Sequence, residues 1–131
     1  MPFSVDFQAL ADKVKSDIDT VTRKSTLDIF SAVVARSPVD TGRFKGNWNC
    51  SRGTLDESTT ETINSARGDS EASKALSFSS GDIVYLTNAL PYAYRLEYGD
   101  DGVPYSKQAP AGMVRITAAE FEQYVKRVLA K

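Results

Sequence analysis

The sequence predicts an α+β fold in which helices and a small sheet share one domain. Apolar residues recur every three or four positions over the first 34 residues and again near the end, which predicts two amphipathic helices. Two segments between them carry strand patterns, from Phe44 to Ser51 and from Ile83 to Asn88. The chain has 131 residues, which fits one core, so we treat 1–131 as a single domain.

The first predicted helix runs from Val5 to about Val34, with an apolar face that includes Val14 and Ile18. At ~1.5 Å per residue, such a helix would span roughly 45 Å, which is longer than a compact domain of this size needs. The helix therefore either lies across the sheet of its own chain or offers part of its length to a neighbouring subunit.

A turn follows the helix. Pro38 pushes Ser37 out of helical geometry and has no N–H to donate. Asp40, Thr41 and Gly42 come next, a run in which the Asp side chain can bond backbone amides and Gly supplies a positive φ. Pro38, Asp40, Thr41 and Gly42 are thus predicted structural turn residues.

The strand predicted after this turn places Phe44, Gly46, Trp48 and Cys50 on a buried face. The opposite face would then carry polar residues, Asn47 and Asn49 among them. Cys50 is the single cysteine, and the sequence contains no His to act as its base, so we interpret it as a buried apolar residue and not as a nucleophile.

Residues 53–82 have a different composition, rich in Ser, Thr and acidic residues. Loops of this length are uncommon in compact domains, so we predict a mobile acidic excursion, a long polar loop. Two parts of it have local patterns of their own. Thr59 to Ile63 is predicted as an edge strand, and Ser70 to Leu76 as a short helix with Asp69 or Ser70 as its cap.

After the second strand, Pro91 fits the first turn of a short helix, and Gly99 is predicted to terminate it in the left-handed region. Tyr94 and Tyr98 lie four residues apart and so share one face. With Tyr92, they either pack into the core with wet hydroxyls or anchor an interface, where Tyr and Arg are favoured. The predicted interface residues are Arg43, Tyr92, Tyr94, Arg95, Glu97 and Tyr98.

The final helix is predicted to begin at about Pro110 and to run through Tyr124 and Val128. Thr117 to Glu120 also has the pattern of a capping box, which would place the start of the helix at Thr117 instead.

Composition argues against several classes of function. The net charge of −1 gives no general attraction to nucleic acid or to an anionic membrane, and no apolar run approaches the roughly 20 residues that cross a bilayer. Met1 to Leu10 has no pattern of a secretory leader, which predicts a soluble protein. We predict no metal, no cofactor and no enzymatic activity. Glu97 with Asp100 or Asp101 is the closest carboxylate set, and an open turn would not raise their pKa values as acid catalysis requires.

Three segments, in this order along the chain, resemble a family of small proteins from tailed phages. The first is Pro38-Val39-Asp40-Thr41-Gly42-Arg43-Phe44, with Asn47-Trp48 shortly after. The second is Asn88 with Pro91-Tyr92-Ala93 and Leu96-Glu97-Tyr98-Gly99, and the third runs from Ser106 to Val114. The family comprises the tail-completion or head–tail joining proteins of long-tailed phages, often described as minor tail proteins.

The resemblance implies a small, mostly antiparallel sheet packed by the long N-terminal helix and a C-terminal helix. It also implies a structural virion protein that assembles as a ring, commonly a hexamer, at the neck. Its partners would be the tail tube or tail terminator and the head connector, and its location the virion, after assembly in the host cytoplasm. The segment from Asp100 to Tyr105 is longer than the tight turn that the family pattern leads us to expect.

Two further hypotheses concern charge. The basic residues Arg36, Arg43, Lys45 and Arg52 would face acids in the excursion of a neighbouring subunit. The same basic residues could alternatively meet phosphates, which would make the chain a nucleic-acid-binding module of the neck, although its net charge argues against this. We further expect the isolated protein to be a weakly associating monomer, with ring closure driven by the end of the tail.

Overall fold

The computed structural model describes residues 7–39, 41–99, 103–104 and 106–130, so the predicted turn residue Asp40 lies outside the described part. It confirms the α+β fold class. The elements in chain order are α1 (Phe7–Ala35), α2 (Arg43–Gly46), β1 (Asn49–Arg52), α3 (Ala66–Ala72), the 3-10 helix η1 (Ser73–Ser77), β2 (Val84–Thr87), α4 (Ala93–Tyr98), α5 (Val114–Ala119) and α6 (Phe121–Leu129).

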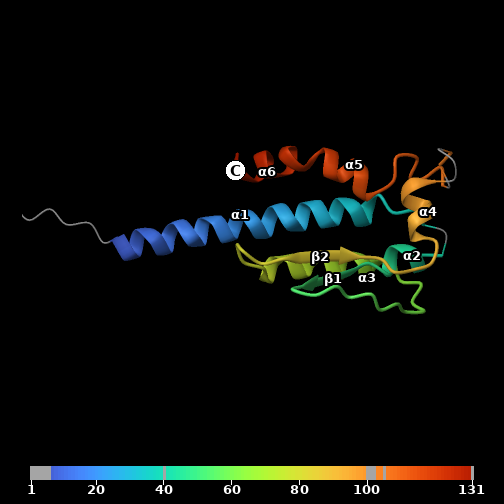
Figure 1. The fold of residues 1–131 in the computed structure, drawn as a ribbon, viewed down its shortest axis with the longest axis horizontal. Helices are drawn as coiled ribbons and strands as arrows, with labels where there is room; N and C mark the ends of the chain where they lie inside the picture. The colour runs from blue at the N-terminus through green and yellow to red at the C-terminus, as the bar shows by residue number, and fades with distance from the viewer. Residues whose placement is uncertain (1–6, 40, 100–102, 105, 131) are drawn as a thin grey trace, which may run out of the picture.

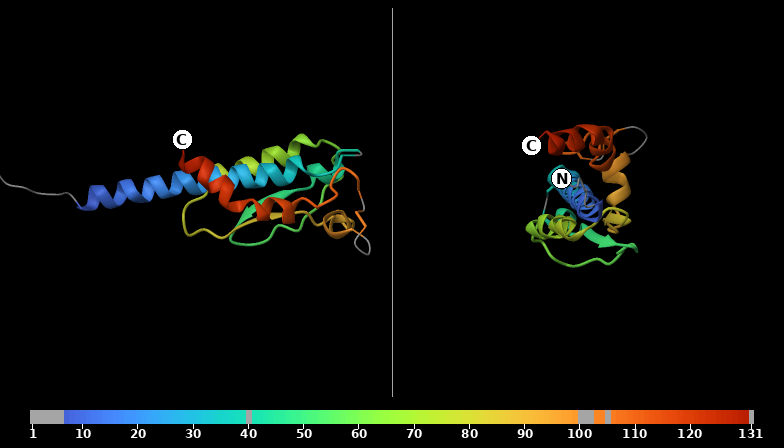
Figure 2. Two further views of the ribbon diagram at one scale, coloured as in Figure 1. Left: turned by 90° about the horizontal axis from the view of Figure 1, so that it is seen from above. Right: turned by 90° about the vertical axis from the view of Figure 1, so that its left-hand side faces the viewer.

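Helix α1 is the spine of the molecule. Figures 1 and 2 show α5 and α6 on one side of its C-terminal half, and the sheet with α3 on the other. Val33 and Val34 are buried between these layers, at 4% and 0% exposure. The N-terminal half projects beyond the body (Figure 1), and Val14 and Ile18 are half exposed there. The C-terminal half of the helix therefore lies across its own domain, and a contact of the projecting half with a neighbouring subunit stays a prediction.

Two hydrogen bonds that share the Ser37 hydroxyl hold the end of α1 in place. The Ser37 hydroxyl donates to the Val33 carbonyl at 2.9 Å and accepts from the Trp48 indole N–H at 2.8 Å. Pro38 is buried directly after it. The predicted stop before Pro38 is confirmed, and Trp48 is a core residue as expected, with 5% exposure.

The predicted strand from Phe44 to Ser51 is wrong in its first half. Gly42 has φ +92°, and Arg43–Gly46 then forms a helical turn, so β1 begins only at Asn49. Asn47 and Asn49 were predicted on a polar outer face, yet they are 0% and 1% exposed. Their side-chain amides bond backbone groups, which alternating hydrophobicity cannot reveal.

The sheet has two antiparallel strands, with Cys50 opposite Leu86 and Ser51 opposite Tyr85. Strand β2 lies within the predicted range Ile83 to Asn88. Cys50 and Leu86 contribute to a core cluster with Phe78.

The prediction of a mobile excursion over residues 53–82 is wrong for its second half, because residues 66–78 form packed structure. Helices α3 and η1 lie against α1, and Ala72, Ala75 and Phe78 are buried. The short helix predicted from Ser70 begins earlier, at Ala66, with Ser65 at the N-cap position. Thr59 to Ile63, predicted as an edge strand, has no strand partner in the described part of the chain.

Helix α4 confirms the expected short helix between Pro91 and Gly99, and its Leu96 is buried. Pro91 lies in the turn that leads into the helix, which begins two residues later. Gly99 has φ +73° and ψ −168°, so its φ is positive as predicted, although its ψ places it outside the left-handed helical region. A Cβ at this position would lie 2.2 Å from the Val103 carbonyl oxygen, which requires glycine.

The C-terminal helix differs from both predicted starts. It begins at Val114 and breaks at Glu120, where φ is −101° and ψ is 9°. Thr117 is not a cap, because its hydroxyl donates back to the Met113 carbonyl at 2.7 Å. Glu120 instead pairs with Arg36, the residue directly after α1, at 2.7 Å, which joins the break in the helix to the end of α1. Among the described residues, no helix is long and apolar enough to span a bilayer.

Candidate functional site

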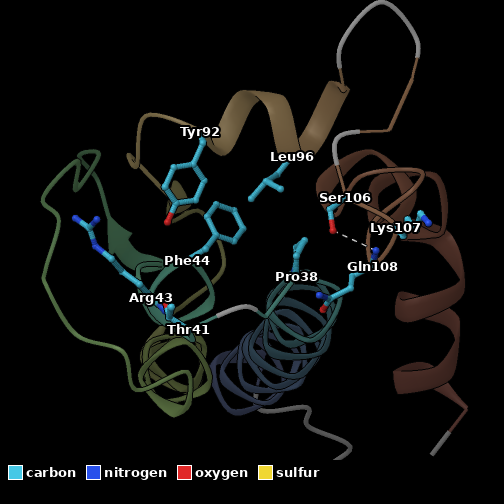
Figure 3. A pocket seen from close by; sticks show the side chains of 9 residues that line it. All are labelled: Pro38, Thr41, Arg43, Phe44, Tyr92, Leu96, Ser106, Lys107 and Gln108. Atoms are coloured by element: carbon cyan, nitrogen blue, oxygen red, sulfur yellow. Dashed lines mark hydrogen bonds between the residues drawn. The ribbon is translucent and has the colours of Figure 1, made fainter.

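Three segments that are distant in sequence meet at one end of the molecule, around an open cavity of about 710 Å³. Figure 3 shows its lining from three directions: the turn after α1, helix α4, and the segment before α5. The lining residues are Pro38, Thr41, Arg43, Phe44, Tyr92, Leu96, Ser106, Lys107 and Gln108. These are the same three segments that carry the family resemblance in the sequence.

Side chains fasten the three segments together. Gln108 makes a two-way bond with the backbone of Val39, accepting from its N–H at 2.9 Å and donating to its carbonyl at 3.1 Å. Asn88 donates to the Phe44 carbonyl at 2.8 Å, which ties the end of β2 to α2. These irregular segments have no strand partner, so the side-chain bonds satisfy their backbone groups instead. The bonds thereby give the wall of the cavity a defined shape.

Aromatic rings form the apolar side of the cavity. The Phe44 ring lies 5.9 Å from that of Trp48, nearly edge-on at 70°, and 5.8 Å from that of Tyr92. Edge-to-face and tilted pairs of this kind are favoured by the ring quadrupoles. Tyr92 therefore follows the core-packing alternative, with its ring against Phe44.

The core-packing alternative is wrong for Tyr94 and Tyr98, because they lie on the surface. Their exposures are 71% and 50%, and the two ring centroids are 4.6 Å apart. The Arg115 guanidinium lies 4.9 Å from the Tyr98 centroid, a cation–π distance that holds the pair in place. Arg95 is exposed on the same helix. Helix α4 thus presents a pre-ordered aromatic and basic face.

Glu97 was predicted at an interface, and that prediction is wrong for the folded chain, where it is 8% exposed. Its carboxylate accepts the backbone N–H groups of Met113, Val114 and Arg115 at 3.0, 2.6 and 3.2 Å. The Arg115 side chain adds an ion pair at 3.0 Å. Glu97 therefore caps the start of α5 and locks α4 to it.

The electrostatics of Glu97 agree with this role. Burial raises the pKa of its carboxyl, but the N–H donors of Val114 and Met113 and the Arg115 side chain outweigh burial, so the net pKa is lowered. Gly112 makes the close approach possible, since a Cβ there would lie 2.0 Å from a carboxylate oxygen of Glu97.

Three of the four basic residues that were predicted to face a neighbouring subunit have acidic partners within their own chain. Arg36 pairs with Glu120, Arg43 with Glu61 at 3.5 Å, and Arg52 with Asp82 at 3.6 Å, all within one chain. Glu61 and Asp82, two of the acids of residues 53–82, thus have partners within the chain. Arg43, also a predicted interface residue, lies on the cavity wall, with its guanidinium directed away from the centre (Figure 3).

Cys50 is buried at 3% exposure, as the sequence predicted. Burial, together with the nearby Glu71 carboxylate, raises the pKa of its thiol to about 11.

We expect negligible labelling of Cys50 by a thiol reagent at pH 8 in the native state and rapid labelling in 6 M guanidinium. Because the folded pKa exceeds the unfolded one, we also expect stability to fall as pH rises from about 8.5 towards 11. Fast native labelling at pH 8 would contradict the buried thiol.

No specific pattern in the sequence marks Gln108, Asn88 or Asn47 as side chains that bond the backbone. They stand in turn-rich segments, where such bonds are common, but the partner of each is distant in the chain.

Comparisons with family models, with curated proteins and with solved structures found no match to this chain. In the part of the chain that the structure describes, no group of three or more His, Cys, Asp or Glu side chains could hold a metal ion.

Proposed function

We propose that this chain is a structural phage protein that joins head and tail, closing the head-proximal end of the tail or binding it to the connector as part of a ring. The observation that carries the proposal is the convergence of the three family-like segments on one cavity at one end of the molecule. A set of turns held by dedicated side-chain bonds is typical of a surface whose shape must be specified.

Two further features support a docking role. The tyrosine pair of α4 is exposed and already ordered, and such residues contribute strongly to interfaces because little entropy is lost when they bind. The projecting half of α1 supplies additional surface away from the body (Figure 1). Together they offer two separate contact regions, as a protein that bridges two partners needs.

The proposal is tested in the phage or prophage genome that encodes the chain. Removing the coding sequence should give filled heads and free tails that do not join, and supplying the wild-type chain should restore infectious particles. The double variant Tyr94→Ala and Tyr98→Ala should fold normally but lower the yield of joined particles by about 100-fold, because central aromatic anchors dominate interface energy.

The matched control is Phe121→Ala, which removes an aromatic side chain of similar exposure, 55%, from α6. It should leave particle yield unchanged. Normal virions assembled without the chain, or equal yields from both tyrosine and control variants, would refute the proposed function.

A further inference from the structure

The two edges of the sheet differ in how their backbone groups are satisfied. The outer edge of β1 is covered by α3, whose side chains act in place of a third strand. Glu71 accepts the Cys50 N–H at 3.2 Å, and Arg67 donates to the Trp48 carbonyl at 3.2 Å. Protein folds commonly block strand edges in this way, because an open edge pairs with other chains.

The outer edge of β2 has no such cover. The Gly53 N–H donates to the Ile83 carbonyl at 2.8 Å, one position beyond the pair Arg52 and Val84. Hydrogen-bonded and non-bonded pairs alternate in an antiparallel ladder, so Val84 and Leu86 direct their N–H and C=O groups away from β1.

The hydrogen bond from the Cys50 N–H to Glu71 agrees with this assignment. Cys50 stands opposite Leu86 and directs its N–H away from β2, so Leu86 directs its own backbone groups away from β1. Within the described residues, no hydrogen bond is made by the outward backbone groups of Val84 or Leu86. All four residues of β2 are only half-buried.

A second unpaired edge lies on the other side of the sheet, in an extended segment at 56–64 that we name the strap. Asn47 holds the strap by bonding both the N–H and the C=O of Thr60, and Asn49 donates to the carbonyls of Asp56 and Ser58. These bonds use the inner side of the strap.

The outer side of the strap is open. Thr59, Glu61 and Ile63 have exposed side chains, and in the described part of the chain no hydrogen bond involves the backbone groups of Thr59 or Glu61. The Ile63 carbonyl instead lies against Gly42, so the open stretch of the strap ends before Ile63. The sequence of this stretch has the character of an edge strand, but no strand of its own chain reaches it.

We propose that the strap of one copy adds as a strand to the outer edge of β2 in a second copy. The two edges cannot meet within one chain, because the strap is fastened to the β1 side by Asn47 and Asn49. Both edges carry an exposed isoleucine, Ile63 at 69% and Ile83 at 64%, which the contact would cover. The contact joins two different surfaces, so it repeats from copy to copy and closes as a ring when the rotation permits.

This inference deepens the proposed function by naming the contact between subunits, and it rests on that function only for self-association. The edges are short, so the area they bury is small for a stable interface. The contact is therefore weak in dilute solution and strengthens when copies are held side by side.

Mixed disulfide trapping tests the pairing with purified protein and no virion. One preparation carries Ile83→Cys, and a second carries Thr59→Cys, Glu61→Cys or Ile63→Cys. Buried Cys50 is retained in every preparation, and the unsubstituted protein alone gives the background rate of dimer formation. The matched control mixes Ile83→Cys with Leu76→Cys, which is exposed to 53% on η1. Under mild oxidation at high protein concentration, at least one strap cysteine should give the mixed dimer about tenfold faster than the control.

A predominance of dimers joined through two copies of Cys at position 83 would overturn the proposal in favour of pairing between two β2 strands. A rate no higher than that of the control would overturn it in favour of no strand addition. Either result would leave the virion experiment above unaffected, so the two proposals fail separately.

Amide hydrogen exchange gives an independent measurement. In dilute protein, the N–H groups of Val84 and Leu86 should exchange fast while those of Tyr85 and Thr87, which face β1, are protected. At high concentration the outward amides should become protected together with those of Thr59 to Ile63. Concentration-independent exchange at all of these positions would contradict the proposal.

Discussion

Replacing Glu97 by Ala is expected to destabilise the protein by about 3–5 kcal/mol, the range for breaking a buried charged pair by removing one partner. Three backbone N–H groups at the start of α5 and the Arg115 guanidinium would lose their acceptor at once. Urea unfolding followed by circular dichroism measures the loss. Glu122→Ala is the matched control, because its ion pair with Lys126 is long, 4.0 Å, and exposed. That control should change stability by no more than about 0.5 kcal/mol, and a similar small change for Glu97→Ala would contradict the capping role.

The acid sensitivity of the protein should depend on the same side chain. The folded pKa of Glu97 is lowered, so its contribution to stability is complete above the unfolded pKa of about 4.3 and is lost as pH falls through the folded value. Glu97→Gln should therefore be less stable at neutral pH and show a shallower loss of stability below about pH 4. An unchanged acid profile in this variant would assign the acid sensitivity to other carboxyls.

Replacing Trp48 by Ala is expected to cost about 3–5 kcal/mol, the usual range for deleting a large aromatic side chain from a core. Trp48 packs edge-on to Phe44 and donates its indole N–H to Ser37, which in turn bonds the end of α1. One substitution thus opens a cavity and loosens the helix end beside the candidate site. Because Trp48 is the single tryptophan, unfolding must be followed by circular dichroism and not by fluorescence.

Trp48→Phe separates these two effects. It keeps most of the apolar volume but leaves Ser37 without its donor, so a loss of about 1–2 kcal/mol is expected. If Trp48→Phe were as damaging as Trp48→Ala, the hydrogen bond and not the packing would dominate at this position.

The sequence predicted the parts of the fold that repeat a regular pattern. The apolar period of α1, the β-branched run of β2 and the Pro91 to Gly99 boundaries of α4 each reflect local chemistry that one segment contains in full. Asn47 and Asn49 show where such reasoning ends. Alternation placed them at the surface, yet each is buried because its amide finds backbone partners in a strap about ten residues away.

The sequence allowed us to predict which segments form the candidate site, but not how they meet. The three segments could be marked from their turns and aromatic residues, but their meeting depends on long-range bonds such as Gln108 to Val39. Glu97 is the clearest error. A carboxylate beside exposed tyrosines resembles a surface group, and only the approach of α5, allowed by Gly112, turns it inward.

The spine arrangement also affects how the protein is made. The helix α1 emerges from the ribosome before α5 and α6, which cover one of its sides. At about 5–20 residues per second, that side of the nascent helix waits several seconds for its cover. During synthesis, the apolar face of α1 around Val33 is therefore exposed to solvent for an interval. A chaperone that binds the nascent chain in that interval would bind at this face.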